Sequence, residues 1–309
     1  MGTKAFDDFL KSIQAEIVSL INTVTFLNKS IEAFTGKPQL AEKLETAKAN
    51  LKQTNERIKA LKDFFVIMKK DWSDPKNRII GRVVWAPPIT GNTPPHGYTQ
   101  DVCVVKLDKN RFMPNFVQNA INLRTQPVQP ETPNLTVLIP GVKIDPGEFM
   151  SMMYDQADDK FDFDYPLDRH LFKLWGILPA EQINHPTAKD FDDLAVRFVI
   201  KNGSTTGTTI GRLSRFESKV RIYGLTGTFD STETPVFPYG TNRHFGAFSE
   251  GGDSGAVVCG PNGEFVSLLT SGAGHGESVD ITYTTPMHWL WDKVILVKFP
   301  GASLYFDEN

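Results

Sequence analysis

The chain carries the stretch Gly251-Gly252-Asp253-Ser254-Gly255 near its C-terminal end. Glycines on both sides of Ser254 permit a tight, partly left-handed turn, which can direct two backbone N–H groups toward one point. The serine hydroxyl is then a candidate nucleophile, but it needs an imidazole to take its proton and a carboxylate to hold that imidazole. The first histidine of the chain is His96. The turn therefore presents a nucleophile whose base has to be found.

The composition excludes several classes of protein. The 309 residues carry a formal net charge of −3 and no basic stripe, so nucleic acid is not an expected partner. No apolar run approaches the roughly 20 residues of a membrane-spanning helix, and the first residues lack the apolar region of a secretion signal. Cys103 and Cys259 are the only cysteines, so we expect an intracellular, cytoplasmic protein. No potential ligands have the spacing of a metal site, so neither a metal nor an organic cofactor is expected.

The first quarter of the chain has the heptad spacing of a coiled coil. One apolar seam consists of Phe6, Leu10, Ile13, Ile17, Leu20, Val24, Leu27, Ile31 and Phe34. A second consists of Leu40, Leu44, Ala47, Leu51, Thr54, Ile58, Leu61, Phe65, Met68 and Trp72. Between them Gly36 and Pro38 supply a helix end and a helix start. The pattern predicts an antiparallel helical hairpin, in which we expect each seam to bury the other rather than to recruit a partner helix.

From Arg78 onward the pattern changes to short β-branched runs bounded by Gly, Pro and Asn. Residues 78–85 and 102–107 are expected to be neighbouring strands of one sheet. The Asn202-Gly203 pair lies between two such runs and predicts a β-hairpin. Further strands are expected before and after Pro261-Asn262-Gly263, followed by a terminal helix over 287–297.

Here the chain resembles the trypsin/chymotrypsin-like serine proteases. The order of features that carries the resemblance is Gly252-Asp253-Ser254-Gly255, a short strand, an Asn-Gly hairpin, the strand 266–270, Ser271-Gly272-Ala273-Gly274, and Tyr283-Thr284-Thr285-Pro286 before a helix. A group of fungal trypsin-like proteins with a helical insertion in the first barrel is similar in further stretches. These are Arg78-Ile79-Ile80-Gly81, Ala86-Pro87-Pro88-Ile89, Lys201-Asn202-Gly203, Thr205-Thr206-Gly207 and Phe248-Ser249. The resemblance covers about residues 70–300, and the hairpin would be the insertion.

The resemblance implies a mainly β fold with an α-helical hairpin. That fold is a trypsin-like double β-barrel, its first barrel incomplete, plus an N-terminal antiparallel coiled-coil hairpin. The implied domains are the hairpin at 1–74, a partial first barrel at 75–125, a connecting segment at 126–195, and a second barrel with the nucleophile loop and a C-terminal helix at 196–300. Two or three strands cannot close a six-stranded barrel, so the first barrel is expected to leave an open edge.

The resemblance also assigns site residues and a protein or peptide substrate. Ser254 would be the nucleophile, Asp101 would orient the base, and the amides of Gly252 and Ser254 would form the oxyanion hole. The substrate pocket would be formed by Phe248, Ser271, Gly272 and Gly274. Asp253 is expected to be buried, and an unpaired carboxylate there would be costly. An arginine, lysine or histidine would be its partner, and the sequence leaves that choice open.

The departure from the family's pattern is the catalytic histidine, which in the family precedes the aspartate. His96 lies five residues before Asp101 and is a candidate substitute base. Three explanations remain open: an upstream histidine-bearing segment has been removed, a separate chain donates it together with the missing strands, or the hairpin covers the open edge of a pseudoprotease. Loss of the base costs several powers of ten in rate. We therefore expect the isolated chain to be inactive, either as part of a serine endopeptidase or as a protein-binding scaffold acting through its hairpin or cleft.

Overall fold

The structure is a computed structural model that describes residues 2–123, 153, 166, 170–186, 188–189, 194–224, 227–239, 246–274 and 281–304. The chain divides into two compact units. The first is Met1–Val84 with Val105–Pro114, and the second is Trp85–Val104 with Asn115–Asn309. Within the described ranges, no helix combines the length and the apolar character needed to cross a membrane.

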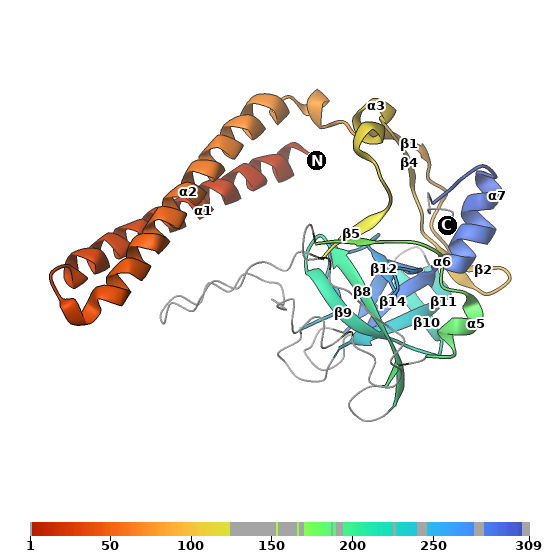
Figure 1. Ribbon diagram of the computed structural model, residues 1–309. Coiled ribbons are helices and arrows are strands. Elements are labelled where there is room, and N and C mark those ends of the chain that lie inside the picture. The colour runs from red at the N-terminus through yellow and green to blue at the C-terminus, as the bar shows by residue number, and fades with distance from the viewer. Residues whose placement is uncertain are drawn as a thin grey trace. The chain divides into compact units, whose positions relative to one another are not determined.

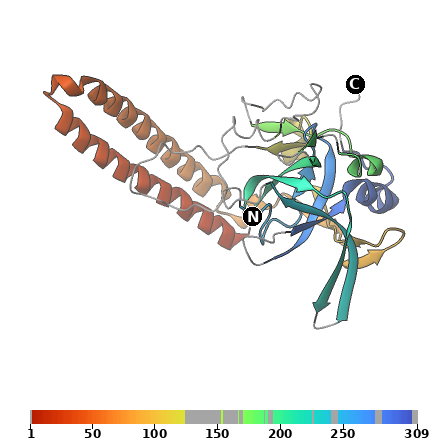
Figure 2. The same ribbon diagram turned by 90° about the horizontal axis from the view of Figure 1, so that it is seen from below.

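The first unit is built on two long helices, α1 (Thr3–Phe34) and α2 (Ala41–Trp72). They lie side by side in both Figure 1 and Figure 2. Gly36 has a φ of 80°, a conformation that glycine adopts without strain, and the short 3-10 helix η1 (Pro38–Leu40) completes the connection. The predicted helical hairpin is thus confirmed.

The buried residues of the hairpin follow the heptad. They are Phe6, Ile13 and Leu20 on α1, and Ala47, Thr54 and Ile58 on α2. A spacing of seven keeps these side chains on one helix face, so each helix covers the seam of the other. Arg57 of α2 lies 3.5 Å from the Glu16 carboxylate of α1. Outside the seams, apolar side chains stay exposed, among them Val18, Ile21, Phe26, Val66 and Ile67.

Arg78 closes the open end of the hairpin. Its guanidinium donates to the carbonyl oxygens of Trp72 and Ser73 at 2.5 and 2.8 Å, and to the Thr3 hydroxyl at 3.3 Å. It also lies 4.4 Å from the centre of the Phe6 ring. A cation beside the last carbonyls of a helix satisfies acceptors that have no partner within the helix. Arg78, on the 3-10 helix η2 (Pro75–Arg78), therefore ties the start of α1 to the end of α2.

A small sheet follows the hairpin. Strand β1 (Gly81–Trp85) pairs with β4 (Val104–Leu107), as the sequence predicted for neighbouring strands. Among the described strands, these two pair only with each other. Their side chains Val83, Val105 and Leu107 are exposed. Two-stranded sheets are only marginally stable alone, and the exposed side chains give this sheet an apolar surface.

The second unit holds a ten-stranded sheet in which six strands pair in a closed cycle. The cycle runs β8–β9–β11–β14–β13–β12 and returns to β8, with all pairs antiparallel. The strands are β8 (Ala195–Gly203), β9 (Gly207–Leu213), β11 (Gly227–Pro238), β12 (Val257–Cys259), β13 (Phe265–Ala273) and β14 (Ile281–Pro286). The β8–β9 hairpin forms at Asn202-Gly203, where it was predicted.

Alternation along these strands separates two apolar clusters. One contains Leu178, Val199, Leu213, Val236, Phe248, Val258 and Val266, contributed mainly by strands from around the cycle. Side chains that converge from several strands of a closed cycle lie inside it. The other cluster takes the alternate side chains, such as Phe198 and Ile200, and packs them with Trp289 and Leu290 of the C-terminal helical segment. Lys201 alternates with Ile200, so it shares the inward face with Val199.

Other strands of the second unit pair with members of this cycle. Strand β10 (Ser218–Gly224) pairs with β11, and the two continue as a ribbon that projects beyond the cycle (Figure 2). Strands β2 (Thr90–Thr93) and β3 (Tyr98–Gln100) pair with each other and lie beside β11. The other described elements of the second unit are β5 (Ala120–Asn122), β6 (Leu171–Lys173), α5 (Ala180–Ile183), β7 (Ala188–Lys189), α6 (Met287–Trp289), the π-helical η4 (Leu290–Ile295) and α7 (Leu296–Lys298). The first unit also contains α3 (Lys109–Phe112), which is followed by η3 (Met113–Asn115).

Candidate active site

The turn around Ser254 lies directly before strand β12. Gly252 and Gly255 have φ values of 107° and 85°, so the backbone on both sides of the serine is left-handed, as expected from its glycines. The Gly255 amide donates to the Leu269 carbonyl at 2.8 Å, and the Leu269 amide donates to the Ala256 carbonyl at 3.0 Å. These two bonds fasten the end of the turn to strand β13.

Ser254 is exposed, and its hydroxyl makes no hydrogen bond to a described residue. Neither the amide of Gly252 nor that of Ser254 donates to any group in the described ranges. The turn therefore presents one hydroxyl and two unengaged N–H groups within three residues. A turn that carries a nucleophile and stabilises an oxyanion requires these groups: a hydroxyl to attack and N–H donors for the negative oxygen.

Asp253, in contrast to its exposed neighbour Ser254, is buried, with 2% of its surface exposed. One carboxylate oxygen accepts hydrogen bonds from the amides of Thr205 and Thr206 at 2.7 and 3.3 Å. The other accepts from the Thr206 hydroxyl at 2.7 Å and from the Glu250 amide at 3.1 Å. The carboxylate thus joins the turn to the tip of the β8–β9 hairpin.

Lys201 is the cationic partner of Asp253 that the sequence left open. Its ammonium nitrogen lies 3.3 Å from Oδ2 of Asp253, and both side chains are fully buried. The same nitrogen donates to the Thr206 hydroxyl at 2.5 Å and to the Gly207 carbonyl at 3.2 Å. It also lies 5.5 Å from the centre of the Phe248 ring. A lysine at an inward-facing position of β8, two residues after Val199, was the sequence signal for this partner.

Burial and neighbouring groups shift the pKa values of both Lys201 and Asp253. Burial lowers the pKa of Lys201 from its ordinary value, and the Asp253 carboxylate opposes that shift. Burial by itself would raise the pKa of Asp253. Hydrogen bonds from Thr206, Thr205 and Glu250, with the charge of Lys201, outweigh burial and lower that pKa to about 2. At neutral pH Asp253 is therefore a carboxylate.

Asp101, the predicted orienting acid, directly follows strand β3. The Thr99 carbonyl of that strand accepts a hydrogen bond of 3.1 Å from the Thr285 hydroxyl of β14. Strand β14 pairs with β13, and β13 is hydrogen-bonded to the end of the Ser254 turn. Asp101 is exposed. No contact within the described part of the chain joins its carboxylate to Ser254 or to a histidine. Its role as the triad acid stays a prediction.

His96, the candidate substitute base, is exposed and stacks on Tyr98, with 5.4 Å between ring centres. Burial, and after it the neighbouring His96, lowers the pKa of His288 from its ordinary value. The described contacts of His96 thus lead to Tyr98 and His288, and none of them leads to Asp101 or Ser254. Two further histidines, His244 and His275, lie outside the described residues.

The residues predicted to form the substrate pocket differ in exposure. Phe248 is 1% exposed and packs inside the strand cycle. Its carbonyl accepts a hydrogen bond from the Thr209 hydroxyl at 2.7 Å. Ser271 and Gly272 pair with Tyr283 and Thr282 of β14. Gly272 and Gly274 are exposed, and Gly274 has a φ of 110°. The pocket itself stays a prediction.

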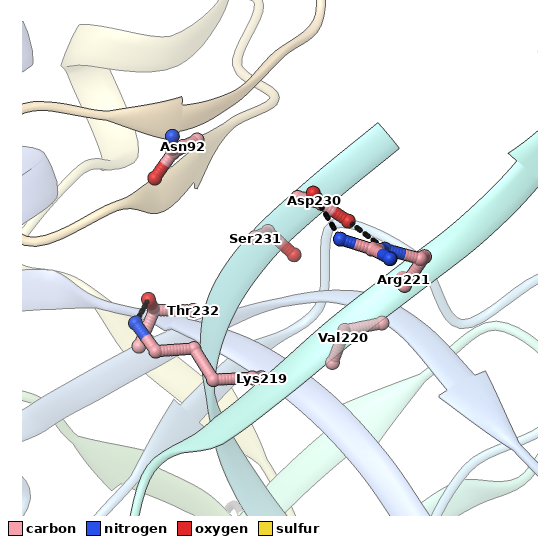
Figure 3. A pocket seen from close by; sticks show the side chains of 7 residues that line it. All are labelled: Asn92, Lys219, Val220, Arg221, Asp230, Ser231 and Thr232. Atoms are coloured by element: carbon pink, nitrogen blue, oxygen red, sulfur yellow. Dashed lines mark hydrogen bonds and ion pairs between the residues drawn. The ribbon is translucent and has the colours of Figure 1, made fainter. Parts of the chain in front are cut away.

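A pocket of about 520 Å³ lies elsewhere in the second unit, between β2 and the β10–β11 ribbon (Figure 3). Its charged groups are already paired. Arg221 donates to both carboxylate oxygens of Asp230, at 2.6 and 2.9 Å, and Lys219 donates to the Thr232 hydroxyl at 2.5 Å. The lining residues are Asn92, Lys219, Val220, Arg221, Asp230, Ser231 and Thr232. None of them belongs to the Ser254 turn. In the described ranges, no group of three potential metal ligands occurs.

No protein-family model and no curated protein matches the chain. Among solved structures, the chymotrypsin of Cellulomonas bogoriensis matches with 24% identity and a TM-score of 0.24, over 34% of this chain and 47% of that one. A glutamic acid-specific serine protease that utilizes a histidine triad in substrate binding matches with 15% identity and a TM-score of 0.23, over 42% of this chain and 63% of that one. The chain thus spans about half to three-fifths of these proteases. The structural neighbours are serine proteases, matched in part and with low TM-scores.

Proposed function

We propose that this chain is a trypsin-like serine endopeptidase module that cleaves protein or peptide substrates. Ser254 is the nucleophile, the amides of Gly252 and Ser254 stabilise the oxyanion, and Asp101 orients the base. The observation that carries the proposal is the Ser254 turn, which combines an exposed hydroxyl, two amides that donate to no described group, and a buried carboxylate held by Lys201. An ordinary surface turn has no need for a buried ion pair beneath it.

In this proposal the closed cycle of six strands is the second barrel of a trypsin-like fold, and the β1–β4 sheet belongs to an incomplete first barrel. The helical hairpin is then an insertion, as in the fungal proteins that the sequence resembles. Among the described strands, β1 and β4 pair only with each other, and this pairing and their exposed valine and leucine side chains support an incomplete first barrel.

The base is supplied by a histidine-bearing segment, from an upstream part or a separate chain, that adds strands to the β1–β4 sheet. A serine without its base retains only the assistance of the oxyanion hole and of substrate binding, which leaves the rate several powers of ten below that of the complete triad. The isolated chain accordingly has negligible peptidase activity. The module acts in the cytoplasm, where two free cysteines are stable.

A fluorophosphonate probe with added imidazole tests this proposal. The probe phosphonylates an activated serine, and free imidazole can replace the missing base when the site around the serine is otherwise assembled. We expect little labelling without imidazole and labelling of Ser254 with it. S254A should abolish the labelling and D101N should reduce it. H96A separates the substitute base: labelling that is present without imidazole and lost in H96A would identify His96 as the base.

The alternative is a pseudoprotease that binds protein partners through its coiled-coil hairpin or its cleft. Two observations favour it: no described histidine contacts Ser254 or Asp101, and the hairpin exposes Phe26, Val66 and Ile67. Absence of labelling at Ser254 with and without imidazole, in a folded protein, would reject the endopeptidase proposal and leave this one.

A further inference from the structure

The Lys201 ammonium is buried, and an acceptor is available for each of its N–H donors. An ammonium group has three N–H donors, and three acceptors lie around this nitrogen: Oδ2 of Asp253 at 3.3 Å, the Thr206 hydroxyl at 2.5 Å and the Gly207 carbonyl at 3.2 Å. With no exposed surface, the group has no access to water. Its charge is therefore balanced inside the protein, and the balancing charge is the residue next to Ser254.

Because Asp253 precedes Ser254 in the chain, its ion pair with Lys201 affects the backbone of the Ser254 turn. Asp253 lies between Gly252 and Ser254, whose amides donate to no described group, so its side chain anchors the backbone that carries both amides. Gly252 and Gly255 on either side are left-handed glycines with wide conformational freedom. Such a turn keeps one geometry only if it is fixed from outside, which the hydrogen bond from Gly255 to Leu269 does at its end and the Asp253 side chain does in its middle.

The anchor is provided by strand β8 and the hairpin tip that follows it. Thr205 and Thr206 contribute two amides and a hydroxyl to the carboxylate, and Lys201 contributes the only positive charge in contact with it among the described residues. Hydrogen bonds alone would leave a buried net charge. The ammonium removes that net charge, so the inward position of Asp253 depends on it more than on any single amide.

We propose that Lys201 is a positioning residue for the Ser254 turn. Its ammonium holds Asp253 inward and thereby fixes the backbone from Gly252 to Gly255 in the geometry that presents the Ser254 hydroxyl and the two amides. Because the cation is carried on strand β8 of the same chain, the turn is assembled without a charged group released by cleavage of the chain or brought by a partner. The proposal rests on the proposed function for the role of Ser254, whereas the anchoring of the turn does not.

Hydrogen exchange of the turn tests the anchoring without reference to activity. K201M keeps the length and apolar stem of the side chain but lacks the charge and the donors. We expect the exchange of amides in peptides covering 250–256 to rise by roughly tenfold or more, while peptides from the β8–β9 ladder keep their protection. K219M is the matched control, because Lys219 is an exposed lysine of the same unit that donates to a hydroxyl. It should leave the turn unchanged.

Unchanged exchange of 250–256 in folded K201M would overturn the proposal. If K201M does not fold, the double variant K201M/D253N removes both charges and restores neutrality. The proposal then requires a folded protein with fast exchange confined to the turn, and wild-type protection in that variant would overturn it.

Fluorophosphonate labelling with imidazole separates the two proposals. If wild-type Ser254 is labelled, K201M should lose most of the labelling and K219M should keep it. Labelling retained in K201M would mean that Lys201 does not position the nucleophile. If wild-type Ser254 is not labelled at all, the proposed function fails, while the exchange measurement still decides whether Lys201 anchors the turn.

Discussion

A side chain at position 203 would occupy the space of the Asp253 carboxylate. A Cβ atom built on Gly203 would lie 2.3 Å from Oδ1 and 2.4 Å from Cγ of Asp253. Real Cβ atoms do not approach other atoms so closely. The hairpin tip that receives the carboxylate is therefore shaped by the absence of a side chain at Gly203, and not only by the donors of Thr205 and Thr206.

The variant G203A should consequently displace Asp253 from its site. We expect a loss of about 1–3 kcal/mol in the free energy of unfolding, the usual range for overpacking a close-packed interior. Labelling of Ser254 should fall with it. Chemical denaturation of the two proteins measures the first effect. G251A is the control for stability, since a Cβ there meets no atom within 4 Å and the backbone is not left-handed. Equal stability of G203A and wild type would contradict the crowding seen at this site.

The pKa of Asp253 predicts a specific loss of stability in acid. Because the pKa is lowered to about 2 in the folded protein from an ordinary 3.8, the folded state favours the carboxylate. The resulting stabilisation is complete above pH 4 and disappears as the pH falls from about 4 toward 2, and it amounts to roughly 2 kcal/mol at 1.36 kcal/mol per pKa unit. Urea unfolding of wild type and D253N between pH 2 and 6 measures it. The difference between the two proteins should shrink in acid, and a constant difference would exclude Asp253 as its source.

The elements that the sequence predicted well are those fixed by local spacing. Ile13 and Leu20 are buried because seven-residue steps keep them on one helix face, and that relation needs no knowledge of the rest of the chain. The same holds for the Asn202-Gly203 hairpin and for the left-handed glycines around Ser254.

The partner of Asp253 could not be assigned in this way. Lys201 meets Asp253 only because β8 pairs with β12 in the register Val258↔Lys201, which depends on the closure of the whole cycle. The placement of Asp101 could not be predicted from local patterns either. Its place is set by strands around β3 that local patterns predict poorly, and no described contact links it to the turn. Local patterns therefore predicted the backbone of the Ser254 turn, whereas its long-range supports required the tertiary structure.

The heptad seam of the hairpin predicts a large difference between two isoleucines of the same helix. Ile13 is 6% exposed and Ile21 is 44% exposed. We expect I13A to lower the stability of the hairpin by about 2–4 kcal/mol through lost burial and a cavity, and I21A to lower it by less than about 1 kcal/mol. Because the two long helices dominate the helical content of the described chain, thermal melting followed by circular dichroism at 222 nm reports on this unit. Similar melting of the two variants would mean that the seam does not hold the hairpin together.

Glu233 predicts a pH dependence of the opposite sign to that of Asp253. It is a buried residue of β11, 2% exposed, and it accepts a hydrogen bond from the Thr99 hydroxyl. Burial raises the pKa of Glu233 above its ordinary 4.5, and the hydrogen bond from Thr99 opposes that shift only in part. The folded protein then binds a proton more readily than the unfolded chain does. Its stability accordingly decreases as the pH rises from about 4.5 through the folded-state pKa.

The variant E233Q has no carboxylate to ionise, so it should lack this decrease. We expect its melting temperature, relative to that of wild type, to increase between pH 4.5 and 8, and a change of about 1 kcal/mol would appear as roughly 2–4 °C in a protein of this size. E181Q is the control, because Glu181 is exposed in the same unit. Its melting temperature should follow that of wild type across the range. If E233Q does so as well, Glu233 ionises over the same pH range in the folded and unfolded protein, and burial does not raise its pKa.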